Sequence, residues 1–139
     1  MFTAKVYKVM VGSLSGTMEE VFAAKETIRK WNLENAERTG KLYMSTEWSV
    51  KADQIQDVDI VIGIVGNWIN NTDFIEKCIK DGKQVMLFFN AYQDPKNTIP
   101  SEHDAVKAYR TKMEECCSCA EYNSFAELSE LLNTRLRTI

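Results

Sequence analysis

Apolar and polar residues follow one another along the chain in a pattern that predicts five strands. The segment 58–65 (VDIVIGIV) is apolar almost throughout, which is typical of a strand covered on both faces. Four other segments are rich in β-branched and apolar residues, as strands are: 5–11 (KVYKVMV), 41–50, 84–90 and 119–122. Apolar positions at helical spacing predict helices between them and after the last: 18–37, 70–81, 101–117 and 125–136. Residues 52–57 predict only a connector or a helical turn.

Capping residues mark where these helices begin and end. Thr17 and Glu20 (TMEE) form the pattern of a capping box, in which each side chain takes one free backbone N–H of the first turn. Ser101 and Ser124 are placed to cap two later helices, and Gly40 is a reasonable stop for the first. Residues 92–100 contain both prolines and are predicted to form a loop.

This alternation predicts one α/β domain over residues 1–139. Its sheet is expected to be doubly wound, five-stranded and mainly parallel, Rossmann-like or flavodoxin-like. Ligands of such folds bind beyond the carboxyl ends of the strands, where the strand order reverses. The segments expected there are 12–16, 48–51, 66–71 and 90–93.

Composition and charge limit the classes of partner that the protein is expected to bind. Hydrophobic residues make up 45% and charged residues 27% of the 139 positions, and the net charge is −3. The basic residues are scattered among acids, so nucleic acid is not an expected partner. No apolar run approaches the roughly 20 residues of a membrane span, and no signal peptide begins the chain. We expect a cytoplasmic protein that does not act at a membrane.

Four cysteines are expected to be reduced in such a protein: Cys78, Cys116, Cys117 and Cys119. Cys116 and Cys119 form a C-x-x-C pattern, but a zinc site needs two further ligands, and His103 is the single histidine. The pattern also lacks the strand-to-helix setting of a thioredoxin motif. The sequence predicts no bound metal and no cofactor.

The first strand-to-helix turn is the first candidate ligand site. Small residues let backbone N–H groups approach a phosphate or ribose, and a helix start adds partial positive charge. The candidates are Gly12, Ser13, Ser15 and Gly16. The turn is not a P-loop, because it lacks the lysine, and Glu19 and Glu20 compete for the same helix end. A plain capped corner is the alternative.

The segment GNWINN after the third strand is the second candidate. Trp68 offers a flat face on which a base or nicotinamide could stack. Polar or close-approach contacts are expected from Gly66, Asn67 and Asn71. The alternative is a loop in which Trp68 packs on the core and the asparagines cap the next helix. Trp48, near the end of the second predicted strand, is a further ligand-binding candidate at the same predicted edge.

Four segments, in order, resemble a bacterial family: VYKVMVGSLSGTMEEVFAAKETIRKWN, DVDIVIGIVGNWI, FIEKCIKDGKQVMLFF and AVKAYRTKMEECCSCAEYNSFAELSELL. The family consists of small Rossmann-like domains related to TIR domains and nucleoside 2-deoxyribosyltransferases, often found in defence and signalling proteins. Relatives usually carry an aspartate where this chain has Gly16, and an Arg-Asp pair where it has Val21 and Phe22. The loops after the second and third strands are also shortened here.

The resemblance implies chemistry at an N-glycosidic bond, which needs a carboxylate close to the sugar. The candidates are Glu47, Asp73 and Glu76, with Asp73 and Glu76 as the predicted catalytic pair. Ordinary surface carboxylates are the alternative for all three. Glu47 and Trp48 should point to opposite faces of their strand, so only one can face a given site. No activated serine lies near His103 in sequence.

Three functions remain open. We favour a module that binds a nucleotide or an NAD-derived signal, acting as a sensor or a sequestering protein in antiviral defence or counter-defence. The alternative is an N-glycosidase or deoxyribosyltransferase acting on NAD or a nucleoside. A ligand-free protein-interaction domain is the third. Val21 and Phe22 stand where relatives carry charge, and an apolar helix face of this kind predicts a homodimer or higher homo-oligomer. The alternative is that one of the two residues belongs to the core.

Overall fold

A single five-stranded parallel sheet forms the centre of the protein. The computed structural model describes residues 2–15, 17–46, 57–70, 72–91 and 99–139. The strands run in the order β2-β1-β3-β4-β5, and every adjacent pair is parallel. Their bounds are β1 (Lys5–Ser13), β2 (Lys41–Thr46), β3 (Ile60–Val65), β4 (Gln84–Asn90) and β5 (Ser118–Tyr122).

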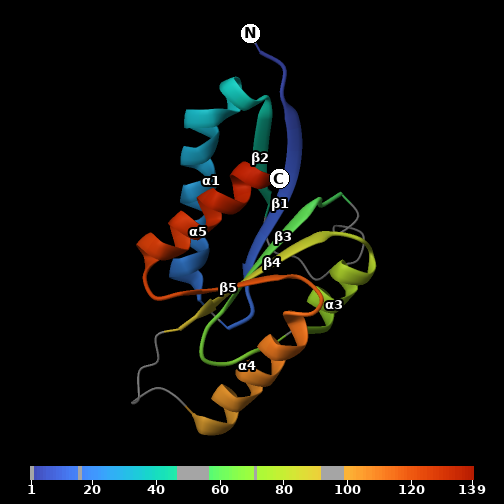
Figure 1. Ribbon diagram of the computed structural model, residues 1–139, viewed down its shortest axis with the longest axis vertical. Coiled ribbons are helices and arrows are strands. Elements are labelled where there is room, and N and C mark those ends of the chain that lie inside the picture. The colour runs from blue at the N-terminus through green and yellow to red at the C-terminus, as the bar shows by residue number, and fades with distance from the viewer. Residues whose placement is uncertain (1, 16, 47–56, 71, 92–98) are drawn as a thin grey trace.

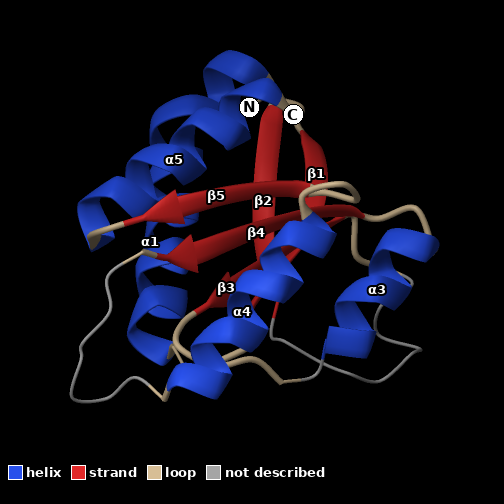
Figure 2. Ribbon diagram, turned by 60° about the horizontal axis from the view of Figure 1, so that its bottom comes forward, coloured by secondary structure: helices blue, strands red, loops and turns tan. Residues whose placement is uncertain are grey.

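Helices cover both faces of this sheet. Figures 1 and 2 show helices on either side of the sheet. One side has α1 (Met18–Thr39) and α5 (Phe125–Thr138), and the other has α3 (Thr72–Lys80) and α4 (Pro100–Met113). The strand order reverses next to β1, because the chain goes from β1 to β2 on one side and then crosses to β3 on the other. The predicted doubly wound α/β fold is therefore confirmed.

Two separate cores result from the alternation of side chains along the strands. Val9 and Val11 of β1 pack under α1 and α5, whereas Met10 packs under α3 and α4. The six residues of β3 are all buried, and its five larger side chains divide between the two cores in the same way. This central position explains why segment 58–65 is apolar almost throughout.

The helix ends agree with the sequence in two places and differ in two. Ser124 caps α5, accepting a hydrogen bond from the Glu127 N–H at 3.1 Å, and Gly40 ends α1 in the left-handed region with φ of 70°. The capping box at Thr17 is wrong, because within the described residues its side chain makes no cap bond and its N–H donates to Ser13 Oγ. Ser101 is not a cap either, because α4 already begins at Pro100.

Other differences concern element bounds and the exposure of two residues of α1. Strand β1 continues through Gly12 and Ser13, which were predicted to end it. Pro100 is the first residue of α4, where a missing N–H costs nothing, rather than part of the preceding loop. Met18 and Phe22, two apolar residues of the helix predicted over 18–37, are exposed by 56% and 66%. The predictions for residues 47–56 and 92–98 concern residues outside those that the structure describes.

None of the described helices is both long enough and apolar enough to span a lipid bilayer.

Candidate functional site

A cavity opens at the carboxyl edge of the sheet, where the strand order reverses. Strands β1 and β3 end at the same level, since Ser13 lies opposite Ile64. The cavity holds about 410 Å³ and lies between the start of α1, the turn after β3 and the end of β4. Its described lining residues are Ser15, Thr17, Met18, Glu19, Glu20, Gly66, Asn67, Trp68 and Asn90. Parallel α/β sheets bind ligands at this point of the fold.

Ser15 connects the two turns that form the cavity. Its side chain is only 6% exposed, and its Oγ accepts a hydrogen bond from the Gly66 N–H at 2.7 Å. The same hydroxyl donates to the carbonyl oxygen of Trp68. One buried serine therefore fixes the turn after β3 relative to the turn after β1.

Gly66 allows these turns to come together. A Cβ atom at this position would lie 2.9 Å from Thr17 Cγ2 and 3.4 Å from Ser15 Cβ. A larger residue would push the turns apart and change the shape of the cavity. The need for glycine here is steric, because the two turns are in contact.

The backbone N–H groups of the first turn are mostly used within the protein. Ser13 Oγ accepts hydrogen bonds from the N–H groups of Ser15 and Thr17, at 3.0 and 2.6 Å. The N–H of Leu14 donates to the Ile64 carbonyl at 2.9 Å. These three groups are not free to hold a phosphate, as the interpretation of the turn as an anion cradle requires. A hydrogen bond of 2.6 Å between Ser13 Oγ and Thr17 Oγ1 closes this arrangement.

Trp68 supplies the aromatic surface of the cavity. Its side chain is 40% exposed, so the alternative in which Trp68 packs into the core does not hold. Its backbone is fixed through the bond from Ser15, and the next turn is fixed by the Asn70 N–H, which donates to the Leu14 carbonyl at 2.9 Å. An indole that is held at its backbone and open on its surface can stack on a planar ligand.

The charged residues among the described lining are both acidic. Glu19 and Glu20 lie in the first turn of α1, and Glu20 is partly buried. Their carboxylates sit at the positive end of the helix dipole, which stabilises them there. The cavity can therefore accept hydrogen bonds from hydroxyl groups, and it opposes a ligand that carries several negative charges.

The two predicted catalytic acids do not line this cavity. Asp73 is exposed in the first turn of α3. Glu76, one turn further, forms an ion pair with Lys112 of α4 and raises the pKa of that lysine through their hydrogen bond. Glu76 is thus engaged between two helices on the α3–α4 side of the sheet.

The remaining predicted residues divide into three groups. Ser15, Gly66, Asn67 and Trp68 are brought together around the cavity. Gly12 and Ser13 belong to β1, where Gly12 is buried opposite Gly63 and Ser13 supports the turn. Gly16, Trp48 and Asn71 lie outside the described residues, as does Glu47.

Sequence reasoning did not assign four of the lining residues to the site: Thr17, Met18, Glu19 and Glu20. It placed Asn90 only within the segment 90–93 expected at the same edge. Thr17 was interpreted as a helix cap, and Glu19 and Glu20 only as competitors of an anion for the helix end. The signal that could have found them is position, since the first residues of the helix after the first strand adjoin the reversal of strand order.

Comparison with known proteins supports the fold of this chain and does not show its function. No protein-family model matches the chain, and no curated protein matches it. Among solved structures, homoserine dehydrogenase from S. aureus is similar, with a TM-score of 0.51 at 13% identity for the structure at pH 7.0. That match covers 85% of this chain and 32% of the enzyme. The structure at pH 6.5 gives 0.50 at 10% identity, covering 86% and 33%. This chain thus spans about a third of the enzyme's length, and identities this low show only the fold.

The fold and the site together define the class of protein. The chain is a Rossmann-like α/β domain with a parallel five-stranded sheet. At its strand-order reversal it carries a cavity lined by one tryptophan, two glutamates and the amide side chains of Asn67 and Asn90.

Proposed function

We propose that this cavity binds a nucleotide or an NAD-derived signal, and that the protein acts as a binding module. The observation that carries the proposal is the open face of Trp68 in a cavity at the reversal of strand order. A purine or nicotinamide ring stacks on the indole, and the Asn67 amide offers a donor and an acceptor to the ring edge. Ser15 and Gly66 keep these groups in place before the ligand arrives.

The acidic lining narrows the ligand class. Glu19 and Glu20 accept hydrogen bonds from the hydroxyl groups of a ribose, and charge-assisted bonds of this kind are the stronger ones. The same carboxylates repel a triphosphate. The proposed ligands are therefore a nucleoside, a nucleotide with few phosphates, or NAD, whose nicotinamide ring carries a positive charge.

The biological part of the proposal rests on the resemblance to TIR-like and deoxyribosyltransferase-like domains. A protein that holds such a signal without consuming it is a sensor or a sequestering protein, and we propose this role in antiviral defence or counter-defence. The similar solved structures belong to a dehydrogenase and support the fold of the proposal alone.

An N-glycosidase or deoxyribosyltransferase is the second candidate. The observation in its favour is that two carboxylates, Glu19 and Glu20, adjoin the cavity where the sugar would lie. The observation against Asp73 and Glu76 in that role is their position outside the described lining. A glycosidase working here would therefore depend on Glu19 or Glu20.

One experiment separates these functions. The protein is incubated with NAD, ADP-ribose, cyclic nucleotides and deoxynucleosides, and both melting temperature and product formation are followed. A ligand that raises the melting temperature and is recovered intact supports the binding module. Release of nicotinamide or free base that is lost in Glu20→Gln supports the enzyme. No shift and no product across the panel overturns both and leaves an interaction domain.

Self-association belongs to the proposal as well. Val21 is buried in the core, whereas Phe22 and Met18, one helical turn apart, are exposed on α1. We propose that this exposed pair contributes to a homodimer. Sedimentation that finds only monomer at working concentrations removes this part of the proposal.

A further inference from the structure

The hydroxyl groups of the first turn can be assigned as donors or acceptors by counting their hydrogen bonds. The sequence SLSGT places hydroxyl side chains at Ser13, Ser15 and Thr17. A serine or threonine hydroxyl donates one hydrogen bond and accepts two. Ser13 Oγ accepts from the N–H groups of Ser15 and Thr17, at 3.0 and 2.6 Å, so both of its acceptor positions are in use.

The bond between the Ser13 and Thr17 hydroxyls therefore has one direction. Their oxygens are 2.6 Å apart, and distance alone allows either to be the donor. Because Ser13 Oγ can accept no third bond, its own proton goes to Thr17 Oγ1. The Thr17 proton then has no acceptor in the part of the chain that the structure describes. Since Thr17 lines the cavity, its hydroxyl can donate to a ligand there.

Ser15 does not provide a second donor of this kind. Its hydroxyl accepts from the Gly66 N–H and donates its proton to the Trp68 carbonyl. Ser15 and Thr17 are the two hydroxyl residues among the described lining of the cavity. Thr17 is therefore the hydroxyl of that lining whose proton is available to a ligand.

Glu20 provides an acceptor beside this donor. It lies three residues after Thr17, at the spacing of a capping-box pair, whose two side chains lie close together at a helix start. Both residues line the cavity. Within the described part of the chain the Glu20 carboxylate forms no hydrogen bond or ion pair. The start of α1 thus presents a neutral donor and a charged acceptor to the same ligand.

Thr17 is also in contact with the turn that carries Trp68. A Cβ atom at Gly66 would lie 2.9 Å from Thr17 Cγ2, and Gly66 precedes Trp68 by two residues. The sugar of a nucleoside is joined directly to its base. A base stacked on the Trp68 indole therefore has its sugar close to Thr17 and Glu20.

We propose that Thr17 and Glu20 recognise the 2′-hydroxyl of a ribose. Thr17 donates to the hydroxyl oxygen, and the hydroxyl donates its own proton to the Glu20 carboxylate. A single hydroxyl can make both bonds, because it accepts and donates at one oxygen. The 2′ position is the relevant one, since its carbon adjoins the carbon that carries the base.

This inference rests on the proposed function of the cavity and adds the class of sugar. Without the 2′-hydroxyl, the Thr17 proton and the Glu20 carboxylate lose their common partner. A site built to bind a hydroxyl discriminates strongly against the analogue that lacks it, because its polar groups are then left unpaired. The cavity should therefore select ribose over 2′-deoxyribose.

The test measures the affinity of the folded protein for three probes by titration calorimetry. The probes are adenosine, AMP and NAD, each compared with the same compound lacking a 2′-hydroxyl, at either ribose for NAD. The native protein should bind the ribose form roughly tenfold more tightly or better, because the deoxy form loses a bond from Thr17 and a charge-assisted bond to Glu20.

Two variants of Thr17 separate its hydroxyl from its shape. Thr17→Val removes the hydroxyl and keeps a branched side chain against Gly66, and it should reduce the preference for ribose roughly twofold to tenfold. Thr17→Ser keeps the hydroxyl and should keep the preference. Because the preference is a ratio measured within one protein, a general loss of stability does not imitate its loss.

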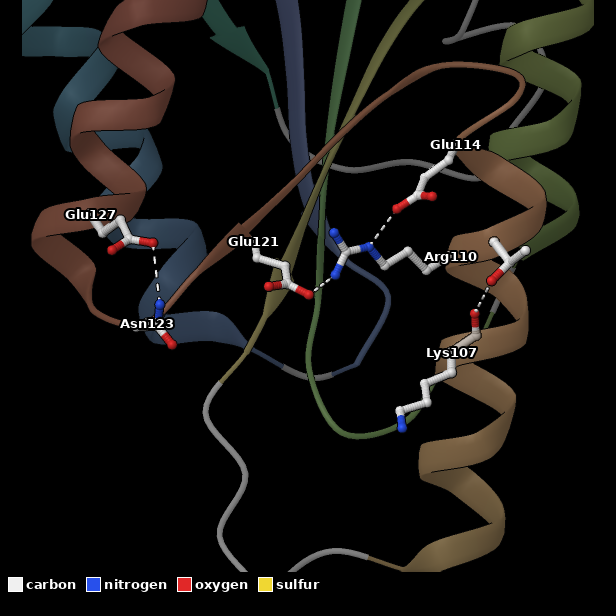
Figure 3. Close-up of polar contacts among 7 residues, drawn as sticks. Lys107, Arg110, Glu114, Glu121, Asn123 and Glu127 are labelled. Carbon is white, nitrogen blue, oxygen red and sulfur yellow. Dashed lines mark hydrogen bonds and ion pairs between the residues drawn. The ribbon is translucent and has the colours of Figure 1, made fainter.

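Thr111→Val is the matched control. Thr111 is exposed on α4, and its hydroxyl donates to the Lys107 carbonyl at 3.1 Å. Figure 3 shows Lys107 on this helix, and Figure 2 shows that α4 lies on the other side of the sheet from α1. The variant removes a threonine hydroxyl that does not belong to the described lining of the cavity. Its affinities and its preference for ribose should equal those of the native protein.

Several results overturn the inference. They are equal affinity for the ribose and deoxy forms of the probes that bind, a preference for the deoxy form, and a ribose preference that Thr17→Val leaves unchanged or that Thr17→Ser loses equally. Failure of all three probes to bind also overturns it. The proposed function is judged separately, since it fails only when nothing in the wider ligand panel is bound or converted. The melting temperature of each variant confirms that the protein tested is folded.

Discussion

The N–H of Gly66 donates to Ser15 Oγ at 2.7 Å, and this bond joins two turns that are 51 residues apart in the chain. The same hydroxyl donates to the carbonyl oxygen of Trp68. Ser15 is therefore hydrogen-bonded both to Gly66, which lets the turns approach, and to Trp68, which faces the cavity. Ser15 is thus the residue through which the fold shapes the site.

Replacing Ser15 with alanine should loosen the cavity. The change leaves the buried Gly66 N–H without its acceptor, which costs about 1–3 kcal/mol. Denaturant unfolding measures the loss of stability, and ligand binding should weaken with it. Ser101→Ala is the matched control, since Ser101 is exposed on α4 and should change neither quantity. Equal stability of the two variants contradicts the role given to Ser15.

Alanine at Gly66 should disturb the site by steric contact. Its Cβ would meet Thr17 Cγ2 at 2.9 Å, and overpacking of this kind costs about 1–3 kcal/mol. Gly82→Ala is an informative comparison, because φ there is +82° while no atom lies within 4 Å of the added Cβ. Both variants should lose stability, but only Gly66→Ala should also lose ligand binding. Equal binding by both variants argues against contact between the turns as the cause.

The fold could be predicted from sequence because its main signals are local. The apolar run at 58–65 and the alternation of strands with helices are enough to predict a parallel sheet with helices on both faces. The ends of elements depend on contacts between distant residues and were less predictable. The local sequence at Thr17 fits a helix cap. In the fold, its N–H and its hydroxyl are hydrogen-bonded to Ser13 Oγ instead, and no capping pattern in the sequence reveals that competition.

The site was predictable in position but only partly in membership. The rule of strand-order reversal led to Ser15, Gly66 and Trp68, all of which line the cavity. Asp73 and Glu76 were chosen through resemblance and closeness in sequence. Their distance from the cavity follows from α3 packing on one face of the sheet, with Glu76 paired to Lys112. Glu76 and Lys112 are 36 positions apart, so no spacing pattern in the sequence predicts that they pair.

Trp68→Ala should weaken ligand binding while leaving the fold intact. Stacking of a base on an aromatic side chain contributes about 1–3 kcal/mol to the free energy of binding, so its loss should raise the dissociation constant roughly fivefold to 150-fold. Titration calorimetry with the ligand found in the panel measures this change. Leu33→Ala is the matched control, since Leu33 is exposed on α1 and does not line the cavity. Unchanged affinity in Trp68→Ala removes the stacking contact from the proposal.

Glu76→Gln should leave ligand affinity unchanged, because Glu76 pairs with Lys112 at the surface between α3 and α4. Surface ion pairs contribute little to stability, so its melting temperature should also change little. Glu20→Gln, at the cavity, should alter affinity for any ligand that carries a ribose. The two variants are compared in the same binding assay. A loss of affinity in Glu76→Gln together with unchanged affinity in Glu20→Gln would contradict this prediction and indicate that Glu76 contacts the ligand.

Two buried tyrosines should respond in opposite directions to loss of the hydroxyl. Tyr43 donates to the Leu136 carbonyl at 2.7 Å, whereas the Tyr122 hydroxyl is buried without a partner among the described residues. Tyr43→Phe should therefore destabilise the protein by about 0.5–1.5 kcal/mol, while Tyr122→Phe should be neutral or stabilising. Urea unfolding at neutral pH compares the two variants. Equal destabilisation by both changes contradicts this assignment of hydrogen bonds.

Tyr43 also determines how the free energy of unfolding should change at high pH. Burial, with a smaller contribution from Tyr7, raises the pKa of Tyr43 from its ordinary value of 10.0 to about 12. The folded state therefore retains a proton that the unfolded chain releases, so this contribution to stability is complete below pH 10 and declines as the pH rises towards 12. Tyr43→Phe removes this group, and its unfolding free energy should fall less steeply between pH 10 and 12 than that of the native protein. Parallel pH profiles for the two proteins would show that Tyr43 ionises alike in both states, against the burial described for it.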